Sequence, residues 1–412
     1  MTPSNSQDDT SLQSQRVISS SQHVDSFSSQ PITQPMEITS DEVIRRIEEL
    51  IELIIEDLDE DTLPVMETYQ EPSGDGLQRT ITKRFNLSQC RSFTSIVLVL
   101  SFCHSLLASG RTTTTREIYY FYVTHFRSQQ ECDLAISDAA VLLQVPRHAL
   151  GLKASPRGWF CGDIQLVRKD TKELILDGRV THLVHGSPIS SEWLVPSSTR
   201  PFEVQTERAT CILVIEKEGI YTRLLEDSFF DDYPCIMVTG KGFPDLATRA
   251  LVHTLHNELG LPVWGLADCN PFGVSVLHTY QHTERLGVDG GSRYGVPIQW
   301  VGLRPSQVEQ LRSGSTALPP AVLQKLTDVD KKRLENSLLK EEHRWTNYGQ
   351  NEQRVQELTD MLDLGYKVEL EALNWLGLDF CADWLGRIFQ YNDKSCAEIE
   401  EDEEAQEWLE II

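Results

Sequence analysis

The chain has 412 residues, two to three times the usual size of a domain, so more than one domain is expected. Its 40% hydrophobic and 24% charged residues are typical of a folded globular protein and exclude collagen-like or wholly disordered chains. The most apolar run, Ser95–Ala108, is interrupted by polar residues and is too short to cross a bilayer, and the Ser- and Gln-rich N-terminus lacks the apolar core of a secretory signal.

The net charge of −25 is unevenly distributed along the chain. Residues 1–75 hold 17 acids and 3 bases and residues 391–412 hold 9 acids and 1 base, whereas residues 76–170 hold 12 bases and 6 acids. The part between, residues 171–390, has a net charge of −9. We expect the basic segment 76–170 to contact nucleic-acid phosphates and the acidic segment 171–390 to bind a metal. Solvated tails are the alternative interpretation of the two acidic ends. Nine scattered cysteines without a Cys-x-x-Cys pair indicate reduced thiols and no zinc site.

The chain begins with a Ser/Gln-rich tail, residues 1–36, which we expect to be disordered. Residues 37–75 form the next segment, an acidic amphipathic helix capped by Ser40 and a loop from Pro64 to Gly76. The apolar stripe of this helix must be buried, either against the body of the protein or a second copy, or against a partner helix.

Residues 76–200 are predicted to form a winged-helix, DNA-binding domain. Periodicity predicts helices over Phe93–Ala108, over Thr114 to about Arg127 and over Cys132–Leu143, with a short helix at Arg147–Leu150. The glycines that follow, up to Gly162, indicate a hairpin. Three helices followed by a hairpin is the order of a winged helix, whose third helix commonly enters a DNA groove.

Residues 201–390 read as an α/β domain, and residues 391–412 as an acidic tail. Short apolar strands are predicted at Cys211–Ile215, Cys235–Val238 and Val263–Ala267, with helices at about 219–229 and 244–259 between them. Strands that alternate with helices in this way predict a parallel sheet, whose chemistry lies at the carboxyl ends of the strands.

Acidic residues follow two of these strands. Glu216 ends the first and Asp268 the third, so we expect both carboxylates to project into one crevice. Hard oxygen ligands of this kind suit Mg²⁺, and Asn270 could offer a third oxygen. Helix caps and solvated loop residues remain the alternative. Gly240-Lys-Gly242, after the second strand, lacks the spacing of a Walker loop and predicts a tight turn.

A tyrosine in the basic segment is a candidate nucleophile. Tyr120 lies four residues after Arg116, so both fall on one helix face, and the guanidinium could supply positive charge to a phosphate under attack. The alternative is packing, which is the usual role of helical aromatics. Basic side chains near the third helix and the wing, at Arg147, Lys153 and Arg157, are candidates for phosphate contacts or for a solvated surface.

Five motifs follow one another along the chain: Arg116-Glu-Ile-Tyr-Tyr120, Ile215-Glu216-Lys-Glu-Gly219, Thr239-Gly-Lys-Gly-Phe-Pro-Asp245, Asp268-Cys-Asn-Pro-Phe-Gly273 and Gly287 to Ser306. Together they resemble the topoisomerase VI A-type family and, more closely, its meiotic double-strand-break transesterases, and the last motif is similar to the plant-type meiotic branch. The resemblance covers about 80–390. It implies a catabolite-activator-like winged-helix domain followed by a Toprim α/β domain with a parallel sheet.

The resemblance also implies roles for particular residues. Tyr120 matches the family's nucleophile and Tyr119 a packing position, while Arg116 matches the basic residue that assists the chemistry. Glu216 and Asp268 match acidic Mg²⁺ ligands. Asn270 departs from the pattern, because the common form has a second Asp there, and this weakens the case for two tightly held metals.

The implied function is DNA transesterification by an ATP-hydrolysing type of DNA topoisomerase, or isomerase, which initiates meiotic recombination in the nucleus. The implied partners are double-stranded DNA, a second copy or a paralogue that pairs its Toprim domain with this chain's tyrosine, and a B-type subunit that binds ATP; no membrane is implied. Two alternatives stay open: a Toprim metal-dependent nuclease in which Tyr120 only packs, and a non-catalytic DNA-binding scaffold, which Asn270 alone favours.

Overall fold

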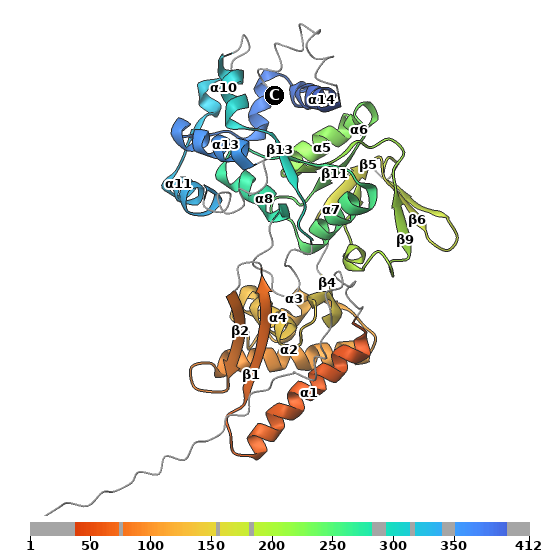
Figure 1. Ribbon diagram of the computed structural model, residues 1–412, viewed down its shortest axis with the longest axis vertical. Helices are drawn as coiled ribbons and strands as arrows, with labels where there is room; N and C mark the ends of the chain where they lie inside the picture. The colour runs from red at the N-terminus through yellow and green to blue at the C-terminus, as the bar shows by residue number, and fades with distance from the viewer. Residues whose placement is uncertain are drawn as a thin grey trace, which may run out of the picture. The chain divides into compact units, whose positions relative to one another are not determined.

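The computed structural model describes residues 38–73, 77–153, 157–180, 185–281, 294–313, 318–339 and 351–393. The expected N-terminal tail, nearly all of the acidic C-terminal tail and residues 287–293 of the plant-type motif lie outside these ranges. The chain divides into two compact units, Met1–Leu152 and Lys153–Ile412 (Figure 1). Each unit has its own hydrophobic core.

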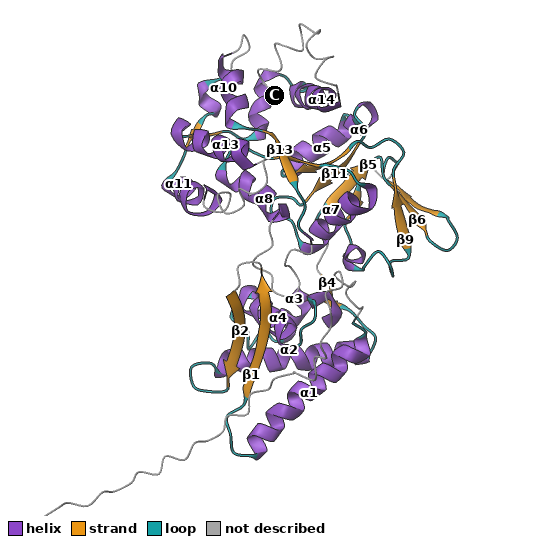
Figure 2. Cartoon of the chain, viewed as in Figure 1, coloured by secondary structure: helices purple, strands orange, loops and turns teal. Residues whose placement is uncertain are grey.

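The first unit is mainly helical (Figure 2). Its elements are α1 (Ser40–Asp59), β1 (Val65–Ser73), β2 (Leu77–Arg84), α2 (Cys90–Ala108), β3 (Thr113–Thr114), α3 (Thr115–Phe121), α4 (Gln129–Leu142), the 3₁₀ turn η1 (Arg147–Leu150) and β4 (Leu152–Lys153).

Helix α1 packs on the body of the first unit through the N-terminal half of its apolar stripe. Val43 and Ile47 are buried, and α1 lies against α2 and η1. Near its C-terminal end, Ile55 and Leu58 are each 51% exposed. Thr39, not Ser40, is the N-cap, because its side chain accepts a hydrogen bond from the backbone of Glu42 at 3.3 Å.

Helix α2 is long and apolar enough to cross a membrane by length and composition, and it begins earlier than the predicted Phe93. In the fold it is a core helix that packs on α1 and α4. Its buried residues are Phe93, Ser95, Ile96, Val99, Leu100, Cys103 and Leu107. Burial on several sides explains why this helix lacks a polar face.

Two local predictions in the first unit were wrong. The segment Pro64–Gly76, expected as a loop, contains β1, which forms an antiparallel hairpin with β2. Helix α3 ends at Phe121 rather than near Arg127, because the β-branched pair Val123-Thr124 follows in a run of turns. The hairpin therefore precedes the three helices, and η1 and the short strand β4 follow them.

The second unit holds a mixed α/β fold. Its strands are β5 (Trp159–Gly162), β6 (Gln165–Arg168), β7 (Leu174–Asp177), β8 (Ser187–Pro188), β9 (Phe202–Gln205), β10 (Cys211–Ile215), β11 (Cys235–Thr239), β12 (Val263–Leu266), β13 (Ile298–Gly302), β14 (Gln324–Lys325) and β15 (Tyr366–Lys367). Its main helices are α5 (Glu218–Glu226), α6 (Phe229–Asp232), α7 (Leu246–Leu259), α8 (Pro271–Gln281), α10 (Pro305–Ser313), α11 (Asp328–Arg333), α13 (Asn351–Leu364) and α14 (Phe380–Asp393). Shorter helical turns include η2 (Ser191–Leu194), η4 (Pro320–Val322), the π-helical η5 (Leu334–Leu338) and η6 (Leu370–Leu376).

The six-stranded sheet of this unit confirms the predicted parallel core. Its order is β13-β12-β10-β11-β5-β8, and the neighbours β13, β12, β10 and β11 are parallel. Every residue of β10 and β11 is buried, which accounts for their continuous apolar sequences. The adjacent strands β10 and β12 both end at the same edge, where Glu216 and Asp268 follow.

The expected hairpin after the third helix and the expected domain boundary near residue 200 were wrong for one reason. Strand β5, which contains Phe160, pairs antiparallel with β11 and so belongs to the sheet of the second unit. At Gly162, with φ of +104°, an added Cβ would lie 2.3 Å from the Cys235 carbonyl oxygen. This glycine marks a close approach to β11 rather than the end of a wing.

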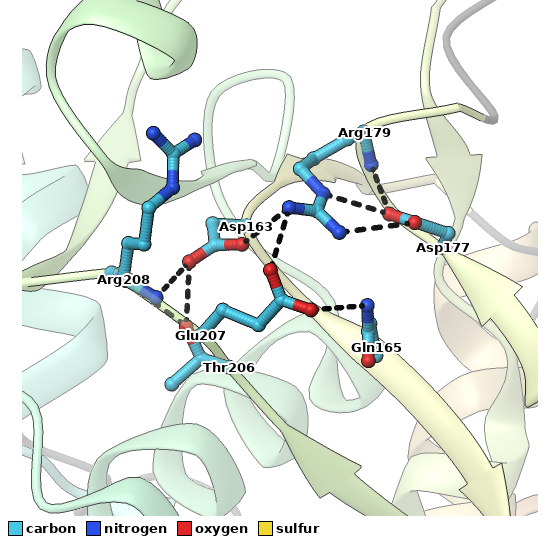
Figure 3. Close-up of polar contacts among 8 residues, drawn as sticks. Asp163, Gln165, Asp177, Arg179, Thr206, Glu207 and Arg208 are labelled. Carbon is cyan, nitrogen blue, oxygen red and sulfur yellow. Dashed lines mark hydrogen bonds and ion pairs between the residues drawn. The ribbon is translucent and has the colours of Figure 1, made fainter.

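A polar network joins the end of β5 to the small antiparallel sheet β7-β6-β9 (Figure 3). The carboxylate of Asp163, 1% exposed, accepts from the Thr206 hydroxyl at 3.0 Å and from the backbone of Arg208, and lies 3.6 Å from Arg179. Arg179 also binds Glu207 at 3.0 Å. Because a buried carboxylate needs such partners, this network fixes the small sheet to the end of β5, which belongs to the six-stranded sheet.

Candidate active site

Glu216 and Asp268 lie together at the carboxyl edge of the parallel sheet, as predicted. Glu216 Oε2 accepts a hydrogen bond of 2.9 Å from the backbone N–H of Asp268. Asp268 is 2% exposed, and its Oδ1 accepts from the backbone of Leu370 at 2.8 Å. Gly273, in the first turn of α8, leaves room for this pair, since an added Cβ would lie 2.7 Å from Glu216 Oε2.

Asn270 lies beside Asp268, but its oxygen already has two donors. Asn270 Oδ1 accepts from the backbone N–H groups of Phe272 at 2.9 Å and Gly273 at 2.7 Å, so it caps the N-terminus of α8. Its amide nitrogen lies 3.3 Å from Asp268 Oδ2. The side chain thus presents a donor, rather than a free oxygen, to the carboxylate.

Three charged residues that the sequence analysis missed complete this cluster. Lys217 Nζ lies 3.0 Å from Asp268 Oδ2 and 2.5 Å from Glu369 Oε2, and it also binds Glu371. Carboxylate oxygens of Asp268, Glu369 and Glu371 lie within 4.8 Å of one another. The alternating acids of Glu369-Leu-Glu371 were the only sequence signal, and nothing local connects them with Asp268.

The electrostatics of the cluster fit a divalent cation. Burial, followed by the negative charge of Asp268, raises the pKa of Glu216 to about 7, and burial raises the pKa of Asp268 to about 6. Burial alone would lower the pKa of Lys217, but its bonds to Glu369 and Glu371 raise it above its ordinary value. Burial makes the charged carboxylates less stable, and a bound cation would offset this by balancing their charge. Carboxylate oxygens are also the ligands that hard metal ions prefer.

The turn Gly240-Lys-Gly242 lies beside Glu216, as the sequence predicted for a tight turn. Lys241 has φ of +54° and Gly242 φ of +87°, and Gly242 donates a backbone hydrogen bond of 2.9 Å to the Glu216 carbonyl. A cavity of about 270 Å³ is lined by Glu216, Lys217, Glu218, Lys241 and Gly242. Two lysines therefore border the carboxylate edge of the sheet.

In the first unit, α3 presents Tyr120 to solvent. Thr114 and Glu117 form the predicted capping box at its start, and Ile118 is buried in the helical core. Tyr120 is 67% exposed, whereas Tyr119 is partly buried and packs against that core. Arg116, one turn before Tyr120, is also exposed.

The three candidate phosphate contacts differ in environment. Lys153, in β4, and Arg157 are exposed, whereas Arg147, in η1, is half-buried. Arg147 and Lys153 follow α4 closely in the chain.

Comparisons with known proteins agree with this arrangement. Residues 91–152 match a family described as type IIB DNA topoisomerase, and residues 211–385 match the Toprim domain family of Spo11 and the A-type chain of topoisomerase 6. Meiotic recombination protein SPO11-2 of Oryza sativa subsp. indica is 31% identical over 327 residues, which cover 77% of each chain. The chain belongs to the family of Spo11 and the A-type topoisomerase VI proteins.

Other relatives in this family come from animals and plants. SPO11 of Mus musculus is 29% identical over 375 residues, 86% of this chain and 87% of the relative. The A-type DNA topoisomerase 6 protein of Arabidopsis thaliana is 28% identical over 299 residues, 72% of this chain and 65% of the relative. The resemblance drawn from the motifs is thereby confirmed, and the second unit contains a Toprim domain, a metal-binding fold, within residues 211–385.

Proposed function

We propose that this protein cleaves double-stranded DNA by tyrosine transesterification and so makes the double-strand breaks that initiate meiotic recombination in the nucleus. The observation that carries the proposal is the exposed Tyr120 phenol on α3 in a member of this family. The family's relatives with meiotic names support the biological setting. The acidic cluster of the Toprim domain, in which Asp268 is buried, supports a metal-assisted reaction.

In the proposed reaction, Tyr120 Oη loses its proton and attacks a backbone phosphorus. A new bond forms between phosphorus and the phenolic oxygen, the bond to the 3′ oxygen breaks, and that oxygen takes a proton to become a free 3′-hydroxyl. The DNA 5′ end stays linked to the protein as a phosphotyrosine. Arg116, on the same face of α3, would offer positive charge to the phosphate under attack.

Glu216 and Asp268 would hold Mg²⁺, with Asn270 fixing Asp268 and the start of α8. When bound, Mg²⁺ supplies positive charge that stabilises phosphate oxygens during the transfer. The chain's own contribution is to keep two carboxylates close together in a buried setting.

One tyrosine cleaves one strand, so a double-strand break requires two chains, either two copies or this chain and a paralogue. We propose that the first unit acts as a winged-helix module and that Arg147, Lys153 and Arg157 contact DNA phosphates. ATP binding would belong to a separate B-type subunit, which would make the assembly resemble an ATP-hydrolysing topoisomerase.

The test is covalent trapping. The wild-type protein, with a B-type partner, DNA and Mg²⁺, should give DNA covalently attached to the peptide that contains Tyr120, and Tyr120→Phe should abolish the adduct. Tyr119→Phe, which alters the partly buried neighbour, is the matched control and should keep it. Cleavage that survives in Tyr120→Phe without an adduct would favour the Toprim nuclease, and no cleavage by any variant would favour the scaffold.

A further inference from the structure

The ammonium of Lys217 lies among acidic side chains of the second unit. Its Nζ contacts three carboxylates, those of Asp268, Glu369 and Glu371. The Lys217 side chain is 20% exposed and that of Asp268 is 3% exposed, so this ion pair is poorly screened by water, whereas Glu369 and Glu371 are 43% and 50% exposed. Since Lys217 directly follows Glu216, one backbone segment places both a carboxylate and the opposing cation at the edge of the sheet.

The segment that carries Glu369 is fixed to the Asp268 loop by the backbone. Val368 donates to the Cys269 carbonyl at 3.0 Å, and Leu370 donates to Asp268 Oδ1 at 2.8 Å. These two bonds flank Glu369 on either side in the sequence. The backbone of Glu369 is therefore held near Asp268 by bonds that do not involve Lys217.

Glu369 and Glu371 are not equivalent, although both bind Lys217. Glu369 lies between Val368 and Leu370, which both donate to the Asp268 loop, and its side chain is 43% exposed against 50% for Glu371. Glu371 instead lines a neighbouring cavity between α5 and the start of α14. Glu369 is thus the carboxylate that the backbone holds next to Asp268.

We propose that Glu369 supplies the carboxylate ligand that Asn270 does not, and that Lys217 is a built-in cation that a divalent metal displaces from Asp268 and Glu369. The inference rests on the proposed metal-assisted function of the Toprim domain and adds two residues to it. The Asn270 oxygen is engaged at the start of α8, so the negative charge missing there is restored from a different segment of the chain. Until the metal binds, the Lys217 ammonium balances the negative charge of these carboxylates.

The experiment measures Mn²⁺ binding to the full-length protein without DNA, by electron paramagnetic resonance of the free ion. Glu369→Gln should weaken Mn²⁺ binding by about tenfold or more, because it removes a ligand but keeps the shape of the side chain. Glu371→Gln is the near control and should change it far less, and Glu335→Gln, an exposed acid of η5, should leave it unchanged. Lys217→Met should bind Mn²⁺ about tenfold more tightly, because the competing charge is gone.

Thermal unfolding with and without Mn²⁺ shows whether each variant is folded. Without metal, Lys217→Met should melt at a lower temperature than wild type, because the three carboxylates repel one another, and added Mn²⁺ should restore it by a larger shift than in wild type. Equal losses in Glu369→Gln and Glu371→Gln would overturn the ligand assignment, since they would indicate only a general charge effect. If Lys217→Met bound Mn²⁺ as wild type does, or more weakly, the proposal that the metal displaces Lys217 would be wrong.

This outcome is separable from that of the proposed function. If Glu216→Gln and Asp268→Asn weaken Mn²⁺ binding and Glu369→Gln does not, the metal site stands and the present inference fails. If Tyr120→Phe still forms adducts with DNA, the proposed nucleophile fails while the metal-binding result is unaffected.

Discussion

Tyr119 and Tyr120 are neighbours in the sequence but lie in opposite environments. Tyr120 is 67% exposed and Tyr119 is partly buried, because the buried Ile118 fixes which face of α3 turns inward.

Asn270, a neutral side chain among acidic residues, has two roles. Its oxygen caps α8, and its amide nitrogen donates toward Asp268.

Two substitutions separate these roles of Asn270. Asn270→Ala should lower the free energy of unfolding by about 1 kcal/mol, because the first backbone N–H groups of α8 lose their acceptor. Asn270→Asp keeps the acceptor and adds a carboxylate beside Asp268, so it should bind Mn²⁺ more tightly than wild type. Urea unfolding and metal titration measure the two effects. Equal unfolding free energies for wild type and Asn270→Ala would contradict the capping role.

Among the elements, α3 depends on its neighbours because it is only seven residues long. Arg91 of α2 joins the middle of the connection between α3 and α4 to the first turn of α4. It donates to the His125 carbonyl, and its Nε binds Glu131 at 2.7 Å. Glu131 also accepts from the backbone of Arg127 at 2.6 Å. This clamp fixes the turn that follows Tyr120, since a helix this short is marginal by itself.

The clamp predicts a specific acid sensitivity. Hydrogen bonds from Arg91 and Arg127 lower the pKa of Glu131 from 4.5 to about 2. The stability that this carboxylate adds is therefore complete above about pH 4.5 and is lost as the pH falls toward 2. Glu131→Gln should be less stable than wild type at neutral pH, and the difference should shrink across that interval. Unfolding curves from pH 7 to pH 2 test this; a constant difference would contradict it.

At the scale of the whole molecule, the chain contributes β5 to the Toprim sheet before it enters the main parallel core. β5 covers the edge of β11, whose residues Cys235–Thr239 are all buried. An uncovered apolar edge strand promotes aggregation. Because β5 belongs to this sheet, the boundary between the units lies at residue 152 and not at residue 200, where the sequence predicted it.

Two fragments test this boundary. A fragment of residues 153–393 should fold, with cooperative unfolding and a dispersed NMR spectrum, because it keeps the complete six-stranded sheet. A fragment of residues 201–393 should aggregate or unfold, since it lacks β5 and β8 and exposes the edge of β11. A stable, monomeric 201–393 fragment would contradict the role assigned to β5.

Local physical signals in the sequence determined much of this protein. Apolar runs identified β10, β11 and β12, the Thr114 and Glu117 pair identified the start of α3, and the rule for parallel strands brought Glu216 and Asp268 together. Each of these depends on residues close in the chain or on a general property of parallel sheets. The motifs at these positions were also sufficient for the family.

Only the tertiary structure decided the features that depend on pairing between distant segments. The sequence of β5 does not reveal that its partner is β11. It also does not reveal that the backbone N–H of Leu370 donates to the Asp268 carboxylate, 102 residues away, which brings Glu369 close to Asp268. The turn before α8 likewise decided that the Asn270 oxygen caps a helix. Hydrogen bonds and ion pairs depend on distance in space, and periodicity along the chain carries no information about which distant segments the fold brings together.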